Sequence, residues 1–284
     1  MGAAPSRLDY LLAAVIAASV STAPIFVLLS GVPGPAAATW RLAISTAILA
    51  AYGAASGSLS RPGARDLALM ALAGALLAAH FDAWMTSLYL IPAGVSTAIV
   101  DSYPAVLVVV GRLAMGERYG PAKVAGAALA VAAAALLSVD PGPRHLEGAA
   151  LALAGMASMA GYVSLGRLLR RRVNLATYAT TVYSVAALVS LLVSLASGCP
   201  LYGYPPRSWA YLVALAVVPM IGGHTVMNYL LGRRDLLASA TPVVAEPAGA
   251  SVLAALVLGQ RLGALDAALV GLAVAGVAAA VAAQ

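Results

Sequence analysis

No charged side chain occurs between Tyr10 and Trp40, and this stretch is longer than one membrane crossing requires. A helix needs ~20 mostly apolar residues to cross a hydrocarbon core of ~30 Å. The turn-forming segment Gly31-Val-Pro-Gly-Pro35 interrupts the stretch, which predicts two membrane helices. The whole chain is also strongly apolar: it has 62% hydrophobic residues, 9% charged residues and a mean hydropathy of +0.95. Such a composition has too little polar surface for a soluble protein of 284 residues.

Charged residues and Pro or Gly breaks divide the chain into ten predicted spans of an all-α membrane protein. The spans are 8–30, 35–57, 65–89, 92–115, 121–139, 147–169, 174–197, 207–232, 236–259 and 264–283. Arg7 before an apolar run also fits a signal peptide, but this run is too long for one. With a cytoplasmic amino terminus, twelve Lys and Arg residues fall in inner segments and three in outer loops. This bias predicts a multi-pass protein of the cell membrane with both termini cytoplasmic.

The surplus of 16 Lys and Arg over 10 Asp and Glu lies almost wholly in connecting segments and forms no basic cluster with interleaved aromatics. Nucleic-acid binding is therefore not expected. The sequence also has no Cys/His metal cluster and no phosphate-binding Gly-Lys-Ser/Thr loop, so neither a metal, a cofactor nor ATP-driven transport is predicted. The expected partners are the lipid bilayer and a small-molecule substrate. Patches of small residues favour close helix packing within or between chains, which leaves monomer and homodimer both open.

An internal repeat appears when the chain is shifted by 143 positions, which aligns Pro104 with Pro247, Gly116 with Gly259, Arg118 with Arg261 and Gly120 with Gly263. The repeats are residues 1–142 and 143–284. Five helices per repeat is an odd number, so the two halves are predicted to cross the membrane in opposite senses. This inverted arrangement is typical of secondary transporters, whose substrate site lies near the midplane between the repeats. A duplicated scaffold without a transport role is the alternative.

Paired motifs in the two halves carry a family resemblance. They are Trp40-Arg41-Leu42, Ile91-Pro-Ala-Gly94 and Met115-Gly-Glu-Arg-Tyr119 in the first half, and Glu246-Pro247 and Leu258-Gly-Gln-Arg-Leu262 in the second. In order, spacing and duplication they resemble the EamA-like branch of the drug/metabolite transporter superfamily. The resemblance implies a ten-helix carrier with a central cavity that moves small metabolites such as amino acids and their derivatives. Gln260 departs from the family pattern, which usually has Glu there.

Ionisable side chains inside the spans are the first candidates for function, because each costs at least ~2.5–3.5 kcal/mol at the centre of a membrane helix. They are Arg41, His80, Asp82, Asp101, His224 and Glu246. Arg41, Asp82 and Asp101 are expected at similar depth from the outer side. This cluster fits a substrate or proton pathway, although a structural salt bridge is an equal alternative for Arg41.

The repeat supplies a second, mirrored pair, because Phe81 aligns with His224 and Tyr103 aligns with Glu246. A buried Glu246 could be held protonated and His224 could change charge near neutral pH, so a proton-coupled cycle is a hypothesis. A neutral His224 bonded to the backbone or to Asn228 is the alternative. Prolines in spans four and nine predict kinks beside Asp101 and Glu246.

The predicted substrate-binding residues combine these groups with polar aromatics in mid-span positions, where packed residues with satisfied polar tips are the alternative. They are Arg41, Asp82, Trp84, Asp101, Tyr103, Tyr162, His224, Asn228 and Glu246. No catalytic residue is predicted. The predicted function is secondary active transport of a small polar metabolite by alternating access. The alternatives are an intramembrane enzyme using Asp82 and Asp101 as a carboxylate pair, and a passive channel.

Overall fold

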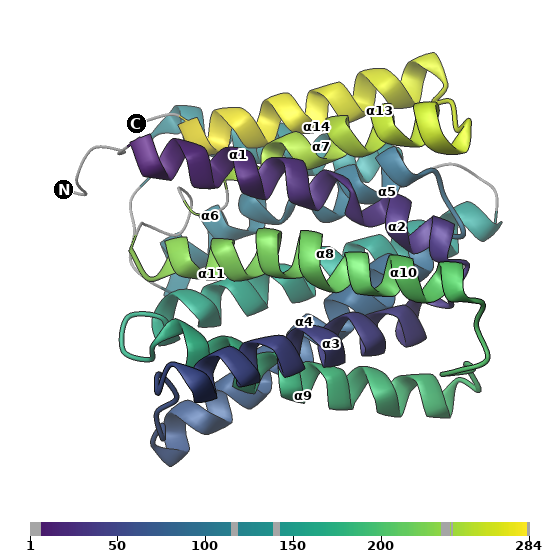
Figure 1. Cartoon of the computed structure of the whole chain (residues 1–284). Coiled ribbons are helices and arrows are strands. Elements are labelled where there is room, and N and C mark those ends of the chain that lie inside the picture. The colour runs from purple at the N-terminus through teal and green to yellow at the C-terminus, as the bar shows by residue number, and fades with distance from the viewer. Residues whose placement is uncertain (1–6, 115–118, 139–142, 234–238, 240, 283–284) are drawn as a thin grey trace.

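The computed structural model describes residues 7–114, 119–138, 143–233, 239 and 241–282, and its regular elements are all helices. Figure 1 shows them side by side in one bundle, with their axes running between the same two ends. The first half of the chain contains α1 (Arg7–Ser21), α2 (Ala23–Ser30), α3 (Gly34–Ala55), α4 (Ala64–Ser87), α5 (Ala93–Val100), α6 (Tyr103–Ala114) and α7 (Pro121–Leu137). The second half contains α8 (Pro143–Leu169), α9 (Leu175–Ala196), α10 (Pro206–Leu215), η1 (Ala216–Thr225), α11 (Val226–Leu231), η2 (Thr241–Ala245), α13 (Glu246–Leu258) and α14 (Ala264–Ala282).

Six helical stretches in the described part of the chain are long and apolar enough to cross a membrane. They are Tyr10–Ser30, Ala64–Ser87, Ala93–Leu113, Pro143–Leu169, Leu175–Ala196 and Pro206–Leu231. Three further apolar helices are shorter: Pro121–Leu137, Pro242–Leu258 and Ala264–Ala280. The expectation of an all-helical chain agrees with this arrangement, while ten crossings stay a prediction. The motif residues Met115–Arg118 and the predicted inner residue Arg234 lie outside the described residues.

Two helix breaks fall at the prolines that predict kinks. α5 ends at Val100 and α6 begins at Tyr103, so Pro104 occupies the first turn of the new helix. The 3₁₀ turn η2 leads into α13, whose second residue is Pro247. Proline suits a first turn, where its missing N–H has no bond to make. The predicted kinks therefore lie where expected. The first break has Asp101 at the carboxyl end of α5, and the second has Glu246 at the start of α13.

A third irregularity has no simple signature in the sequence. Residues Ala216–Thr225 form the π-helix η1, which contains Pro219 and ends beside His224. π-Helical segments are rare and occur often at functional sites. This segment joins α10 to α11 in one continuous run, so the helix changes its winding in the middle of the bundle.

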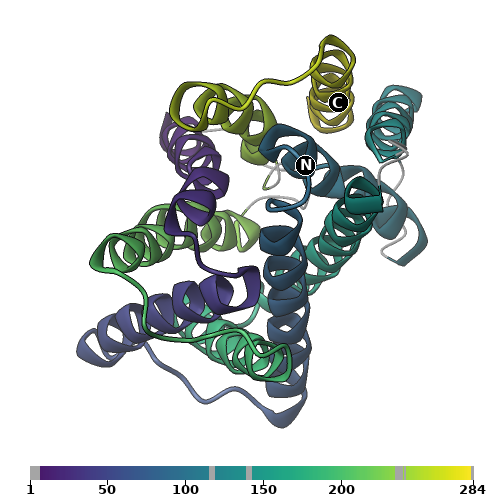
Figure 2. The ribbon, with the colours of Figure 1, turned by 90° about the vertical axis from the view of Figure 1, so that its right-hand side faces the viewer.

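The first residues of α1 and the last residues of α14 lie at the same end of the bundle in Figure 1. α7 and α14, the last helices of the two halves, pack side by side in both ribbon views (Figures 1 and 2). Their backbones approach closely: a Cβ added at Gly126 would lie 2.5 Å from the backbone nitrogen of Ala280, and one at Gly276 would lie 2.6 Å from that of Ala130. Glycine permits this approach, as in other tightly packed membrane helices.

Candidate functional site

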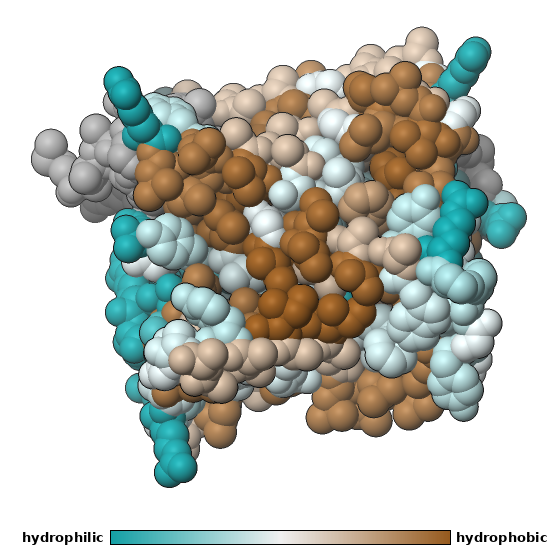
Figure 3. Space-filling view, viewed as in Figure 1, coloured by the Kyte–Doolittle hydropathy of each residue, from teal (hydrophilic) through white to brown (hydrophobic). Residues whose placement is uncertain are grey.

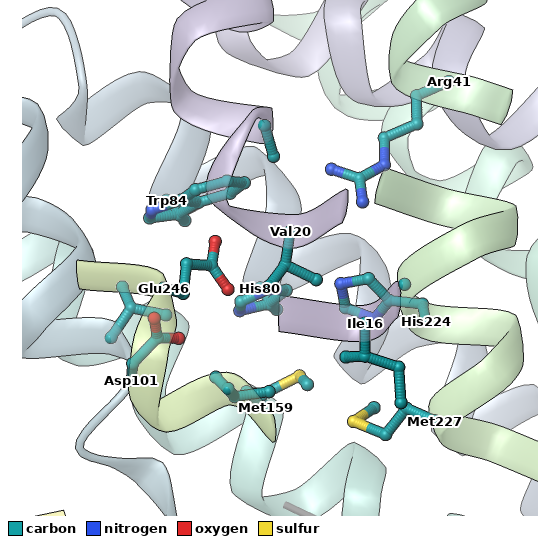
Figure 4. Close-up of a pocket in the computed structure, with 14 residues that line it drawn as sticks. Ile16, Val20, Arg41, His80, Trp84, Asp101, Met159, His224, Met227 and Glu246 are labelled. Atoms are coloured by element: carbon teal, nitrogen blue, oxygen red, sulfur yellow. The ribbon is translucent and has the colours of Figure 1, made fainter. Parts of the chain in front are cut away.

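A small cavity lies inside the bundle, where helices of the first and second halves meet. Its lining residues are Ile16, Val20, Ala23, Arg41, His80, Trp84, Val100, Asp101, Met159, Gly223, His224, Met227, Val243 and Glu246 (Figure 4). The cavity has a volume of about 20 Å³, which is room for about one water molecule. The cavity is therefore too small in this structure to hold a metabolite.

The carboxyl groups of Asp101 and Glu246 meet in this cavity. Asp101 caps the carboxyl end of α5 at the first break, and Glu246 is the first residue of α13 at the second. Both side chains are buried, their carboxyl groups lie near each other in Figure 4 and interact electrostatically, and Asp101 Oδ2 has no hydrogen-bond partner among the described residues. The pair is built from both halves of the chain, and burial of two adjacent carboxyl groups favours a state in which one of them carries a proton.

Arg41 brings the positive charge of the cavity from α3. Its side chain is 1% exposed, and the guanidinium carbon lies 4.1 Å from the centre of the Phe81 ring. Its Nε and Nη1 have no hydrogen-bond partner among the described residues, although its charge interacts electrostatically with Glu246. Figure 4 shows the guanidinium on one side of the site and the two carboxyl groups on the other, with His80 between them in this view. Arg41 therefore has unused donors that face a region of negative charge.

Two imidazoles complete the polar lining. His80 Nδ1 lies 3.1 Å from the carbonyl oxygen of Gly155, and because a carbonyl only accepts, Nδ1 carries a proton. The ring stacks on Trp84 with the planes 6° apart, and its centre lies 6.1 Å from that of His224. His224 Nδ1 is buried without a hydrogen-bond partner in the described part of the chain. The sequence-based alternative of a bond from His224 to Asn228 is not found here.

Asn228 instead joins a buried polar network beside the cavity. Its Nδ2 donates to Tyr162 Oη at 2.6 Å and to Tyr183 Oη at 3.2 Å. Tyr183 Oη also bonds Thr225 Oγ1 at 3.1 Å, and Thr225 Oγ1 donates to the carbonyl of Met220 inside η1 at 3.2 Å. These bonds connect α8 and α9 to the π-helix. The network therefore fixes the helix segment that presents His224 to the cavity.

The structure brings some of the predicted site residues together and separates others. Arg41, Trp84, Asp101, His224 and Glu246 all line the cavity. Tyr103, Tyr162 and Asn228 lie outside that lining; Tyr103 is fully buried, and its Oη is 3.8 Å from the sulfur of Met227, which does line it.

Asp82 also lies apart from this lining. It is two residues from His80 on α4 and so projects from a different face of that helix, near Ser190 of α9. Neither Asp82 oxygen has a hydrogen-bond partner in the described residues. His80, by contrast, is a lining residue that the predicted site lacks. The sequence does indicate this position, because His80 lies four residues before the predicted site residue Trp84, and residues i and i+4 share a helix face.

Comparison with known proteins agrees with this architecture. The model of the EamA-like transporter family matches residues 8–139 and again residues 146–282. The chain is 28% identical over 240 residues to a probable terminal-alkyne amino-acid exporter of Streptantibioticus cattleyicolor, covering 81% of this chain and 79% of that protein. A crystal structure that is 24% identical in sequence superposes with a TM-score of 0.73 and covers 97% of this chain and 98% of its own, which establishes a shared fold. The chain is a multi-pass membrane transport protein, and it belongs to the EamA-like transporter family.

Proposed function

We propose that this protein is a secondary active transporter that moves a small polar metabolite, such as an amino acid or a derivative of one, by alternating access. The proposed topology is ten crossings in two inverted five-helix repeats, residues 1–142 and 143–284, with both termini in the cytoplasm. The two family matches along the chain support this topology, as does the common end at which α1 begins and α14 finishes. Inverted repeats place a substrate site at the interface of the halves, which is where the cavity lies.

The charges of the cavity suit a substrate that carries both a carboxylate and an ammonium group. Arg41 Nε and Nη1, which have no partner among the described residues, can donate to a carboxylate, and guanidinium–carboxylate pairs are strong when desolvated. Asp101 and Glu246 form the complementary site for an ammonium group. The exporter of Streptantibioticus cattleyicolor, which is named for an amino-acid substrate, also supports this substrate class.

The observation that carries the proposal is the contact between Asp101 and Glu246. In the substrate-free state the pair keeps one proton, because two adjacent carboxylates would repel each other inside the membrane. A substrate ammonium that enters the site supplies the positive charge instead, so the proton leaves. Proton and substrate would then occupy the pair alternately, and this exclusion couples movement of one to movement of the other in the opposite direction.

Binding also requires the cavity to enlarge, because its volume holds about one water molecule. The breaks beside Asp101 and Glu246 and the π-helix next to His224 are the irregular points of the surrounding helices. Breaks in membrane helices are tolerated where they line a cavity, and they give a helix two segments that can move separately. We propose that the two access states differ by movement at these points.

The first test is a stability screen of the purified protein against amino acids and related metabolites, followed by uptake of each stabilising compound into sealed vesicles. A transporter gives saturable uptake that unlabelled analogues inhibit. Product formation in detergent would instead support the enzyme, and conduction without saturation would support the channel. Either outcome would contradict the proposal.

A further inference from the structure

Two adjoining surface pockets lie near the end of the bundle at which α1 begins and α14 finishes, and they are separate from the central cavity. The first, of about 430 Å³, lies among α3, α9 and the end of α11 and is lined by Tyr52, Ser58, Arg170, Asn174 and Arg233, among others. The second, of about 300 Å³, lies along α1, η1 and α11 and has the apolar side chains of Leu8, Leu12, Ile221 and Val226. Leu175 and Tyr229 line both pockets, so the polar pocket continues into the apolar one.

Arg170 lies at the inner wall of the polar pocket. Its Nε donates to the carbonyl oxygen of Asn228 at 3.0 Å, and its Nη1 donates to that of Val173. A Cβ placed on Gly232 would lie 3.1 Å from Arg170 Nη2, so this guanidinium rests against the residue that precedes Arg233. Partial burial lowers the pKa of Arg170, because the charged form loses hydration there. A nearby anion would therefore stabilise the charged guanidinium of Arg170.

Arg233 supplies a second guanidinium at the same pocket. Its Cζ lies 4.5 Å from the centre of the Tyr229 ring, which stacks it against the residue shared by both pockets. Among the described residues, no carboxylate pairs with Arg170 or Arg233; the nearby Arg172, in contrast, forms an ion pair with Asp66 at 2.7 Å. The pocket therefore carries two positive charges without a negative partner in this part of the chain.

An anion that also carries a hydrocarbon chain would fill both pockets at once. In Figure 3 hydrophilic side chains gather along the left edge of the view, where the helices end, and hydrophobic ones cover the adjoining surface over α1 and η1. Basic pockets between membrane helices on the cytoplasmic side are known to bind phospholipid headgroups. We propose that an anionic phospholipid binds here, with its phosphate between Arg170 and Arg233 and an acyl chain in the groove of Leu8, Leu12, Ile221 and Val226.

Such a lipid would contact the network beside the transport cavity. Arg170 bonds the backbone of Asn228, whose side chain holds Tyr162 and Tyr183. The lipid site would thus stabilise the α8–α11 contact. The lipid site rests on the two pockets and on the proposed cytoplasmic orientation of this end of the bundle, and it does not depend on the identity of the transported substrate.

The test titrates the purified full chain in detergent with phosphatidylglycerol and, separately, with phosphatidylcholine of the same acyl chains. Bound lipid is counted by native mass spectrometry, and the unfolding midpoint is followed. Phosphatidylglycerol is expected to bind preferentially and to raise the midpoint. Arg233→Gln should weaken its binding about five-fold, the effect of one basic residue near a membrane surface. Arg207→Gln is the matched control, because Arg207 stacks on Tyr211 in the same manner at the opposite end of the α10–α11 run.

A second arm separates a lipid from a free phosphate. Leu8→Gln puts a polar group into the apolar pocket and should weaken phosphatidylglycerol binding, while Leu256→Gln, on an exposed position of α13, should not. Equal binding of the two phospholipids, equal losses in Arg233→Gln and Arg207→Gln, or binding of glycerol phosphate as tight as that of phosphatidylglycerol would overturn the proposal. Arg233 and Leu8 are both exposed, so these variants are expected to fold.

Discussion

The carboxyl groups of Asp101 and Glu246 lie near each other inside the bundle, one from each half of the chain, and interact electrostatically. Each stands at a helix break that a proline follows, and both are buried in the membrane part of the protein. Two adjacent buried carboxylates repel each other, so the pair favours a state in which one of the two groups carries a proton. Several consequences for stability and transport depend on that proton.

Stability should fall as the pH rises far enough to remove the shared proton, because two adjacent carboxylates then repel each other in a low-dielectric site. Asp101→Asn needs no shared proton, since its amide can donate to Glu246 directly. We expect the unfolding midpoint of the wild type to fall with increasing pH over a range in which Asp101→Asn is nearly flat. Thermal unfolding in detergent across a pH series measures this difference. Parallel curves for the two proteins would argue against a shared proton.

Substitution of Arg41 distinguishes a structural role of this residue from a role in substrate binding. A structural salt bridge predicts that its removal leaves a buried carboxylate unpaired and costs several kcal/mol. In the structure Arg41 has no hydrogen-bond partner for Nε or Nη1 among the described residues and lies over Phe81. We therefore expect Arg41→Gln to unfold within a few degrees of the wild type and to lose substrate-induced stabilisation. Arg41→Lys keeps the positive charge but lacks the planar guanidinium, so it should show only part of the substrate-induced stabilisation of the wild type. A collapse of the fold in Arg41→Gln would support the salt bridge.

The sequence predicts most of the polar residues that line the cavity, but it does not predict which of them contact each other. Composition and periodicity predict buried helices, and the first-turn prolines predict the breaks beside Asp101 and Glu246, because both signals are local. The repeat, however, gives equivalent positions and not contacts. Predicted depth groups Asp101 with Asp82, and the repeat groups Glu246 with His224, whereas the packing of α5 against α13 brings Asp101 to Glu246.

The π-helix shows a further limit of the sequence. Pro219 lies inside η1, and Thr225 Oγ1 donates to the Met220 carbonyl in the same segment. The direction in which His224 points follows from that local winding. Such a detail is set by tertiary contacts between α9 and η1, which a single sequence does not display.

Asp82 provides a control for substitutions in the Asp101–Glu246 pair, because it is also a buried carboxyl group. It is buried on α4 near Ser190, outside the cavity lining, and neither carboxylate oxygen is bonded among the described residues. Asp82→Asn removes a buried charge without changing the shape of the side chain, so the unfolding midpoint should stay equal or rise. Transport should persist in Asp82→Asn and fall at least ten-fold in Asp101→Asn, as measured by initial uptake rates. Equal losses in the two variants would place Asp82 in the pathway.

The contact between α7 and α14 should be sensitive to added volume. Gly276→Ala places a methyl group 2.6 Å from the backbone of α7, which a rigid helix pair absorbs only by separating. We expect a loss of about 1–3 kcal/mol in the free energy of unfolding. Gly271→Ala on the same helix is the matched control, because no atom lies within 4 Å of its added Cβ. Equal midpoints for these two variants would contradict the close packing of the pair.

The central claim is that the Asp101–Glu246 pair couples substrate movement to protons. It is tested most directly in sealed vesicles that contain the wild type or Glu246→Gln, with a labelled metabolite selected by its stabilisation of the purified protein. The wild type should concentrate the metabolite when a proton gradient is imposed and lose that ability when an ionophore collapses the gradient. Glu246→Gln should only equilibrate the metabolite, with or without the gradient. Accumulation that ignores the gradient in the wild type, or that persists in Glu246→Gln, would contradict the account.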